Sequence, residues 1–159
     1  MKPGSRVLEY GCGLAPMYRT WRRYFGHIST KWVLADIPNF TMTFLQHCYS
    51  SDPAIESIHI IGPEIFGDPL SGVTGEFDLI ILQEVLEHVK DPLFVLEYLS
   101  KRLTKTGRLN FDFAVSSGLA LDRPQSSEIR NSTLRWIDDY LELDRPLSCG
   151  NVIGVLKKK

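Results

Sequence analysis

Short hydrophobic runs alternate along the chain with segments whose apolar residues recur at helical spacing. Runs rich in β-branched and aromatic side chains predict strands, and apolar positions three or four residues apart predict helices. The predicted strands are residues 6–10, 32–35, 57–61, 77–82 and 108–113, and the predicted helices between them are residues 14–25, 40–49 and 92–103. Strands that alternate with helices indicate crossover units and a mostly parallel sheet.

The helix predicted at residues 92–103 has the clearest boundaries. Asp91 and Pro92 are typical of a helix start, because aspartate caps free N–H groups and proline suits the first turn. Gly107 follows the predicted end. Four leucines recur at helical spacing between these signals: Leu93, Leu96, Leu99 and Leu103.

The remaining pattern predicts how the sheet is built and how it ends. Residues 79–82 are continuously apolar, which suits a central parallel strand that is buried on both faces. Right-handed crossovers then predict a doubly wound, Rossmann-like sheet. A helix at 128–139 precedes two strands, at 140–145 and 151–156, whose short connection suits an antiparallel hairpin. We therefore predict an α/β fold, a doubly wound and mostly parallel sheet that ends in an antiparallel hairpin, with residues 1–159 as a single domain.

Composition and charge narrow the classes of function. The chain has 159 residues and a formal net charge of −1, which argues against nucleic-acid binding driven by bulk charge. Its three cysteines are far apart and form no disulfide framework, so a reducing compartment is expected. Neither a signal peptide nor an apolar segment long enough to span a membrane is visible. A cytoplasmic protein without membrane or nucleic-acid partners is expected.

A glycine-rich turn directly follows the first predicted strand. Gly11 and Gly13 let the backbone approach a ligand closely, and the helix that follows offers unpaired N–H groups. The same turn could also be a purely structural link between strand and helix. Pro16 stands where the dinucleotide fingerprint needs its third glycine, so a nucleotide-dependent oxidoreductase is disfavoured. The pattern that does match is an acid two positions before the first glycine, supplied by Glu9.

Four segments in this order resemble the class I S-adenosylmethionine-dependent methyltransferases. They are residues 7–13 with the glycine turn, residues 34–36 at the end of the second strand, residues 77–92 around the fourth strand, and residues 103–109 before the fifth. The resemblance covers roughly residues 5 to 113. It departs from the family where Ala15 replaces a frequent third glycine. It also departs at the start, since the cap helices that usually precede the first strand are expected to be absent.

The resemblance implies S-adenosylmethionine as cofactor and assigns roles around the first two strands. Glu9 would act near the methionine part of the cofactor, and Asp36 would accept both ribose hydroxyls. Gly11, Cys12 and Gly13 would bind the cofactor through the turn. Each carboxylate also has a structural alternative. Glu9 would bond its own turn, and Asp36 would cap the following helix.

The adenine would lie among residues that follow the second, third and fourth strands. Ile37 and Leu82 would form apolar walls, with ordinary core packing as the alternative for both. Gln83 is a further predicted cofactor contact. An acid after the third strand would contact the adenine amine, and Glu64 and Asp68 compete for that role.

The segment after the fourth strand carries the candidate catalytic residue. His88 could accept a proton from the methyl acceptor, or it could cap or pack at the start of the next helix. Glu84, Glu87 and His88 also resemble a metal-binding segment of some methyltransferases that act on RNA 3′ ends and quinone precursors, and on a helix the two glutamates would share a face. No histidine follows His88, so no metal site is expected.

These observations predict methyl transfer to an oxygen or nitrogen of a small-molecule acceptor, with carbon as the less favoured atom. The alternative is a pseudoenzyme or accessory subunit that keeps the cofactor fold and acts through a partner. Residues 114–127 are the internal candidate for a lid, with Leu119, Ala120 and Leu121 as apolar contacts and Arg123 for an anionic acceptor. Otherwise a partner subunit or a longer parent polypeptide would supply the lid.

Overall fold

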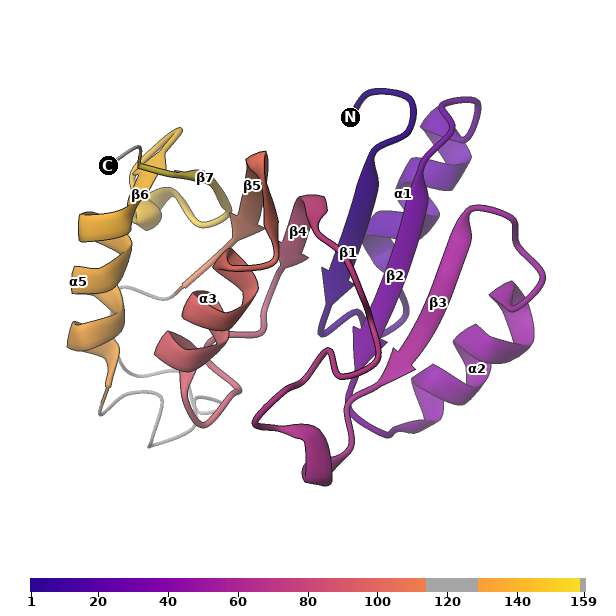
Figure 1. Cartoon of the computed structure of the whole chain (residues 1–159), viewed down its shortest axis with the longest axis horizontal. Coiled ribbons are helices and arrows are strands. Elements are labelled where there is room, and N and C mark those ends of the chain that lie inside the picture. Colours follow the sequence, from indigo (N-terminus) through magenta and orange to yellow (C-terminus); the bar gives the residue numbers. More distant parts are fainter. Residues whose placement is uncertain (114–128, 158–159) are drawn as a thin grey trace. The chain divides into compact units, whose positions relative to one another are not determined.

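The computed structural model describes residues 1–113 and 129–157. Among these residues, seven strands form one sheet in the order β3-β2-β1-β4-β5-β7-β6, with helices in the connections (Figure 1). The predicted fold class is confirmed, a Rossmann-like, mostly parallel sheet that ends in antiparallel strands. The bounds are β1 (Arg6–Tyr10), α1 (Pro16–Phe25), β2 (Lys31–Asp36), α2 (Phe40–Tyr49), β3 (Ile55–Ile60), η1 (Pro63–Ile65), β4 (Phe77–Leu82), α3 (Pro92–Ser100), β5 (Leu103–Phe111), α5 (Arg130–Tyr140), β6 (Leu141–Leu143), η2 (Leu147–Cys149) and β7 (Val152–Leu156).

The first of two compact units is Met1–Leu79. Its strands β1, β2 and β3 pair in parallel, and the central strand β2 is buried from Trp32 to Ala35. Tyr18 of α1 packs edge-on against both Trp32 and Tyr49, the last residue of α2, with ring centroids 5.4 Å apart in each pair. This aromatic cluster ties both helices to β2, so the turn before α1 and the turn before α2 are held at the same end of the strands.

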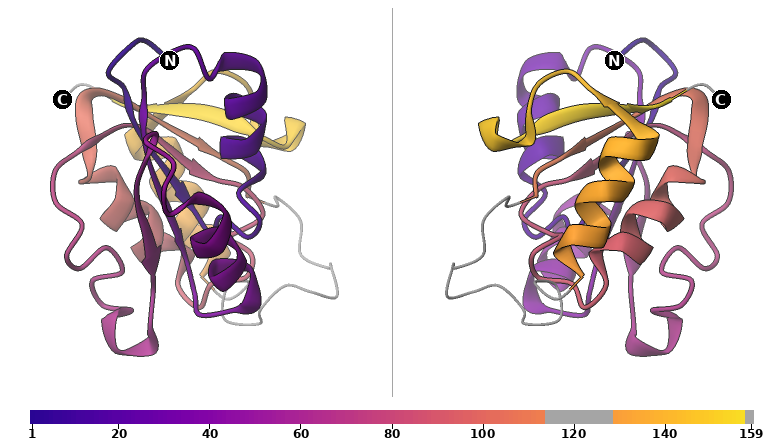
Figure 2. Two further views of the ribbon diagram at one scale, coloured as in Figure 1. Left: turned by 90° about the vertical axis from the view of Figure 1, so that its right-hand side faces the viewer. Right: turned by 90° about the vertical axis from the view of Figure 1, so that its left-hand side faces the viewer.

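The second compact unit is Ile80–Lys159. β7 pairs antiparallel with both β5 and β6, which is the predicted terminal hairpin joined to the fifth strand. α3 and α5 lie side by side (Figure 2). Asp91 caps α3, since its Oδ1 accepts the Phe94 N–H at 2.8 Å. This unit therefore positions the segments that follow β4 and β5.

The structure shortens one predicted helix and lengthens the strand that follows. α3 ends at Ser100, so Leu103 is the first residue of β5 and Gly107 lies inside that strand rather than after a helix. Leucine periodicity alone extended the helix too far, because Thr104 and Thr106 favour extended backbone through their branched side chains. The proposed lid, residues 114–127, lies outside the described residues. Within the described part of the chain, the helices are too short or too polar to traverse a lipid bilayer.

Candidate functional site

The glycine turn after β1 has a left-handed backbone at three alternate positions. Gly11, Gly13 and Ala15 have φ values of 66°, 51° and 51°. The N–H groups of Gly11 and Cys12 both donate to the carbonyl of Ala35, at 2.8 and 3.1 Å. These bonds hold the turn against the carboxyl end of β2. Ala15 occupies the position of the family's third glycine and adopts a conformation that glycine favours.

Open space lies next to Gly13. A Cβ added to Gly13 would meet no heavy atom within 4 Å. The backbone of the turn is therefore accessible to a ligand at this point, as expected where a strand gives way to a helix in an α/β sheet. α1 begins at Pro16, which lacks an N–H group to offer in its first turn.

Asp36, the last residue of β2, is bonded to the glycine turn. Its Oδ2 accepts the Gly13 N–H and its Oδ1 accepts the Ile37 N–H, both at 2.7 Å. The alternative that Asp36 caps the next helix is wrong, because Asn39 is the cap of α2 and accepts the Met42 N–H at 3.0 Å. The short turn between β2 and α2 leaves Asp36 facing the first turn instead.

Glu9 lies beneath the turn and bonds to the start of α1. Its side chain accepts the N–H groups of Met17 and Tyr18, at 3.1 and 2.9 Å, and the residue is only 3% exposed. Burial raises the pKa of Glu9 to about 7, although the two N–H donors lower it. Among the described residues, Glu9 therefore bonds to the start of α1 and not, as the structural alternative had predicted, to its own glycine turn.

Cys12 is buried within the same turn. Its Sγ lies 3.8 Å from the Sδ of Met42, and the residue is 2% exposed. Burial, together with the charges of Asp36 and Glu9, raises the pKa of the Cys12 thiol. The side chain is therefore a packed, neutral thiol at neutral pH.

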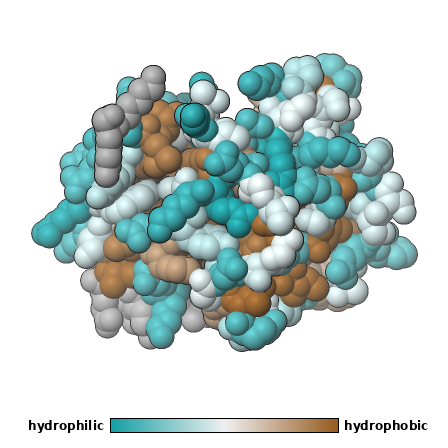
Figure 3. Space-filling view, in the orientation of Figure 1, coloured by the Kyte–Doolittle hydropathy of each residue, from teal (hydrophilic) through white to brown (hydrophobic). Residues whose placement is uncertain are grey.

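The two predicted adenine walls differ in exposure. Ile37 is 52% exposed, so the alternative of ordinary core packing is wrong for this residue. Leu82, at the end of β4, has no exposed surface and is part of the core. Glu64 and Asp68 are both exposed. The segment that carries them begins beside the end of β2, because the Ile61 N–H donates to the Asp36 carbonyl at 2.8 Å. Apolar side chains reach the surface around β3 and this segment at the lower right of the space-filling view (Figure 3).

In the second unit, Gln83 and His88 follow β4. The Gln83 side-chain amide donates to Asn110 Oδ1 at 3.0 Å, which connects the ends of β4 and β5. His88 is exposed, and its Nε2 lies 3.9 Å from Glu87 Oε1. The capping alternative for His88 is wrong, since Asp91 caps α3.

An acidic cluster near His88 joins Glu84 and Glu87 to Asp112, which had not been predicted as a site residue. One carboxylate oxygen from each of Glu84, Glu87 and Asp112 lies within 4.8 Å of the other two. The expectation that the glutamates share a helical face is wrong, because Glu84 has a φ of 54° and residues 84–88 lie outside a helix. The Glu84 N–H donates instead to Asp112 Oδ1 at 2.8 Å. The mostly parallel sheet predicted from the sequence was the signal that could have placed Asp112, which follows β5, near the glutamates that follow β4.

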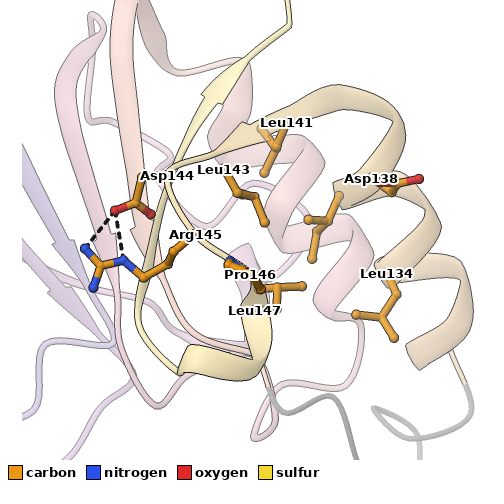
Figure 4. A pocket seen from close by; sticks show the side chains of 9 residues that line it. Leu134, Asp138, Leu141, Leu143, Asp144, Arg145, Pro146 and Leu147 are labelled. Carbon is orange, nitrogen blue, oxygen red and sulfur yellow. Dashed lines mark hydrogen bonds and ion pairs between the residues drawn. The ribbon is translucent and has the colours of Figure 1, made fainter.

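A groove of about 510 Å³ lies between α5 and the segment from β6 to η2 (Figure 4). Leucine side chains from both sides line it, and its lining also includes Asp144 and Arg145, which form an ion pair. None of the predicted site residues lines this groove.

Comparison with known protein families decides the classification. A family model described as "Methyltransferase domain" matches residues 1–140. The chain belongs to this methyltransferase family. The match confirms the resemblance to S-adenosylmethionine-dependent methyltransferases that the glycine turn and the fourth-strand segment indicated. Comparison with curated proteins gives no match.

Solved structures of several proteins share the fold at low sequence identity. The CurJ carbon methyltransferase superposes with a TM-score of 0.72 and 16% identity, over 99% of this chain and 50% of that one. A chain from the complex of the Haloferax volcanii Trm112 methyltransferase activator and a methyltransferase has a TM-score of 0.66 and 14% identity, over 99% of this methyltransferase domain and 85% of that chain. The [4+2]-cyclase SpnF has a TM-score of 0.62 and 15% identity, over 91% and 54%. The domain thus spans about half the length of the CurJ structure.

Proposed function

We propose that this domain binds S-adenosylmethionine at the glycine turn and Asp36, and transfers its methyl group to an oxygen or nitrogen of a small-molecule acceptor. The observation that carries the proposal is the bond between Asp36 and the Gly13 N–H, beside the open space at Gly13. It joins the two segments that the family resemblance assigns to the cofactor.

The residues present fit this cofactor. Each Asp36 oxygen accepts one backbone N–H and has a further lone pair, so the two oxygens can accept two neighbouring ribose hydroxyls. The exposed Ile37 offers an apolar face to a flat ring next to that carboxylate. Glu9 supports the turn by accepting two N–H groups at the start of α1. Leu82, Gln83, Asp68 and Glu64 stay predicted contacts.

The chemistry required of the protein is mainly alignment and proton removal. When bound, S-adenosylmethionine supplies an electrophilic methyl group on a sulfonium. The chain has to hold an acceptor in line with that group and exclude water. His88 is exposed, and it is the group proposed to take the acceptor's proton.

Carbon is the second candidate for the acceptor atom. The CurJ structure is a carbon methyltransferase, and it shares the fold over nearly the whole of this chain. An acceptor carbon must first lose a proton to become a nucleophile, whereas amines carry a lone pair already. Incubation with labelled S-adenosylmethionine and a cell extract, followed by identification of the labelled product, distinguishes the three atoms.

The alternative function is that of an accessory or non-catalytic domain. The SpnF structure is a [4+2]-cyclase on the same fold, so the fold by itself does not determine methyl transfer. The Haloferax complex contains a methyltransferase activator, and a partner of that kind is proposed as one source of a lid over the cofactor. A longer parent polypeptide is the other.

Replacement of Asp36 tests the cofactor proposal. Asp36→Ala should weaken S-adenosylmethionine binding by on the order of 1–3 kcal/mol, because ribose hydroxyls and the Gly13 N–H lose their acceptor. Calorimetric titration measures this loss. Asp144→Ala is the control, because it removes an aspartate that accepts the Ile153 N–H in the hairpin. Equal affinity of wild type and Asp36→Ala would exclude Asp36 from the site, and wild-type protein without affinity would favour the accessory function.

A further inference from the structure

Three carboxylates converge in the second unit from positions that are distant in sequence. Glu84 and Glu87 lie in the segment after β4, and Asp112 directly follows β5. One oxygen of each lies within 4.8 Å of the other two. The bond from the Glu84 N–H to Asp112 Oδ1 fixes the two segments together.

A buried carboxylate oxygen without a partner distinguishes this cluster from a solvated acidic surface. Glu87 is only 8% exposed, and its Oε2 has no hydrogen-bond donor among the described residues. The other oxygen, Oε1, lies 3.9 Å from His88 Nε2, which is longer than a hydrogen bond. A buried, charged oxygen with no donor is costly, and proteins usually satisfy it with a cation or a donor group.

The electrostatics of the cluster are unfavourable without a positive charge. Three carboxylates whose oxygens lie within 4.8 Å of one another repel when they are ionised, and the burial of Glu87 reduces the screening of that repulsion by water. A cation between the three carboxylates would remove this repulsion.

We propose that Glu84, Glu87 and Asp112 form a binding site for a hard divalent cation. Oxygen ligands select Mg²⁺, Ca²⁺ or Mn²⁺ rather than softer metals. Ca²⁺ binds such oxygens at about 2.3–2.6 Å and Mg²⁺ at about 2.0–2.1 Å, and three carboxylates are a donor set that both ions use.

This site differs from the expectation drawn from the sequence. No metal was expected because no histidine follows His88, but the third ligand here is Asp112, a carboxylate that topology places beside the two glutamates. Three protein ligands leave coordination positions for water or for oxygens of another molecule. The proposal does not depend on the proposed methyl transfer, because it concerns only binding of the ion.

Titration of the chelator-treated full chain with the metal alone tests the site. We expect CaCl₂, MnCl₂ or MgCl₂ at constant ionic strength to bind with one ion per chain in calorimetry and to raise the midpoint of thermal unfolding. Asp112→Asn should lower the affinity at least about tenfold, since a neutral amide replaces a ligand charge. Its remaining oxygen can still accept the Glu84 N–H, so the segment after β4 should keep its conformation.

Two further variants make the test decisive. Glu87→Gln should also lower the affinity at least about tenfold, and without metal it should unfold at a higher temperature than wild type because repulsion is relieved. Glu97→Gln on α3 removes an exposed acid of the same unit and should leave the affinity unchanged. The proposal is wrong if none of the three salts binds at millimolar concentration. It is also wrong if Asp112→Asn, folded by circular dichroism, binds the ion as tightly as wild type.

Discussion

At the scale of single residues, the turn after β1 is defined by backbone conformation and by one carboxylate. Gly11 and Gly13 adopt left-handed φ values that cost side-chain-bearing residues free energy. Asp36 accepts the Gly13 N–H, so the second strand fixes the turn that follows the first. Each of these residues therefore has a conformational role and a binding role that a suitable pair of variants can separate.

Gly13→Ala should reduce S-adenosylmethionine affinity much more than it reduces stability. The new methyl group meets no protein atom within 4 Å, so the expected stability cost is only the left-handed conformation, about 1 kcal/mol. The methyl group would project into the space proposed for the cofactor, and we expect calorimetric affinity to fall by at least about tenfold.

Gly72→Ala is the matched control for that variant. Gly72 also has a positive φ, 84°, and open space around an added Cβ, but it lies in the loop before β4. Its stability should fall by a similar amount, measured by urea unfolding, with cofactor affinity unchanged. Equal affinities for Gly13→Ala and wild type would mean that the turn serves structure alone.

At the scale of elements, the side chains that cap α2 and α3 are not the residues proposed to bind a ligand. α2 and α3 both begin with a side-chain cap, supplied by Asn39 and Asp91. α1 has no side-chain cap at Ala15, but Glu9 accepts the N–H groups of Met17 and Tyr18 from below. The starts of α1, α2 and α3 are thus stabilised without Asp36 or His88, which are the residues proposed to act on the ligands.

Asn39→Ala should destabilise the protein by about 1 kcal/mol, the usual cost of losing a side-chain cap. The affinity of this variant for S-adenosylmethionine should be unchanged, because Asp36 keeps both of its hydrogen bonds. Urea unfolding and calorimetry measure the two quantities. Asn39→Asp keeps the cap and should be close to wild type in both. A large loss of affinity in Asn39→Ala would show that the cap and the ribose site are one unit.

At the scale of the whole molecule, a single buried carboxylate makes folding stability depend on pH. Burial raises the pKa of Glu9 from 4.5 to about 7 in the folded protein. Between these values the folded state binds more protons than the unfolded state, so the free energy of unfolding falls as pH rises. The contribution is complete below pH 4.5 and is lost as pH passes the folded pKa.

The free energy of unfolding should therefore fall between pH 5 and pH 8 by on the order of 2 kcal/mol through Glu9 alone. Glu9→Gln cannot ionise, and this part of the pH dependence should disappear from its urea unfolding curves. Glu97→Gln, at an exposed position, should keep the wild-type slope. A Glu9→Gln variant with the wild-type slope would contradict a raised pKa at Glu9.

The elements of this protein could be predicted from the sequence because their signals are local. β1, β4 and α2 have the predicted bounds, since hydrophobic periodicity acts within a few residues and needs no tertiary contact. The glycine turn and the family were recognisable for the same reason, as short segments in a regular order. Where a periodic pattern continued beyond its element, as the leucines did at Leu103, competing backbone preferences ended the helix earlier.

The contacts within the site were decided by tertiary structure. Asp36 and Gly13 are 23 residues apart, and Glu84 and Asp112 are 28 apart, yet hydrogen bonds join each pair. Strand pairing and loop conformation bring such groups together, and neither has a local signal in the sequence. Burial is decided in the same way: Ile37 and Leu82 have similar hydrophobicity, but one is exposed and the other is core. The sequence by itself thus determined the elements and the family, whereas the structure decided which side chains meet, because proximity and desolvation arise only when distant segments pack.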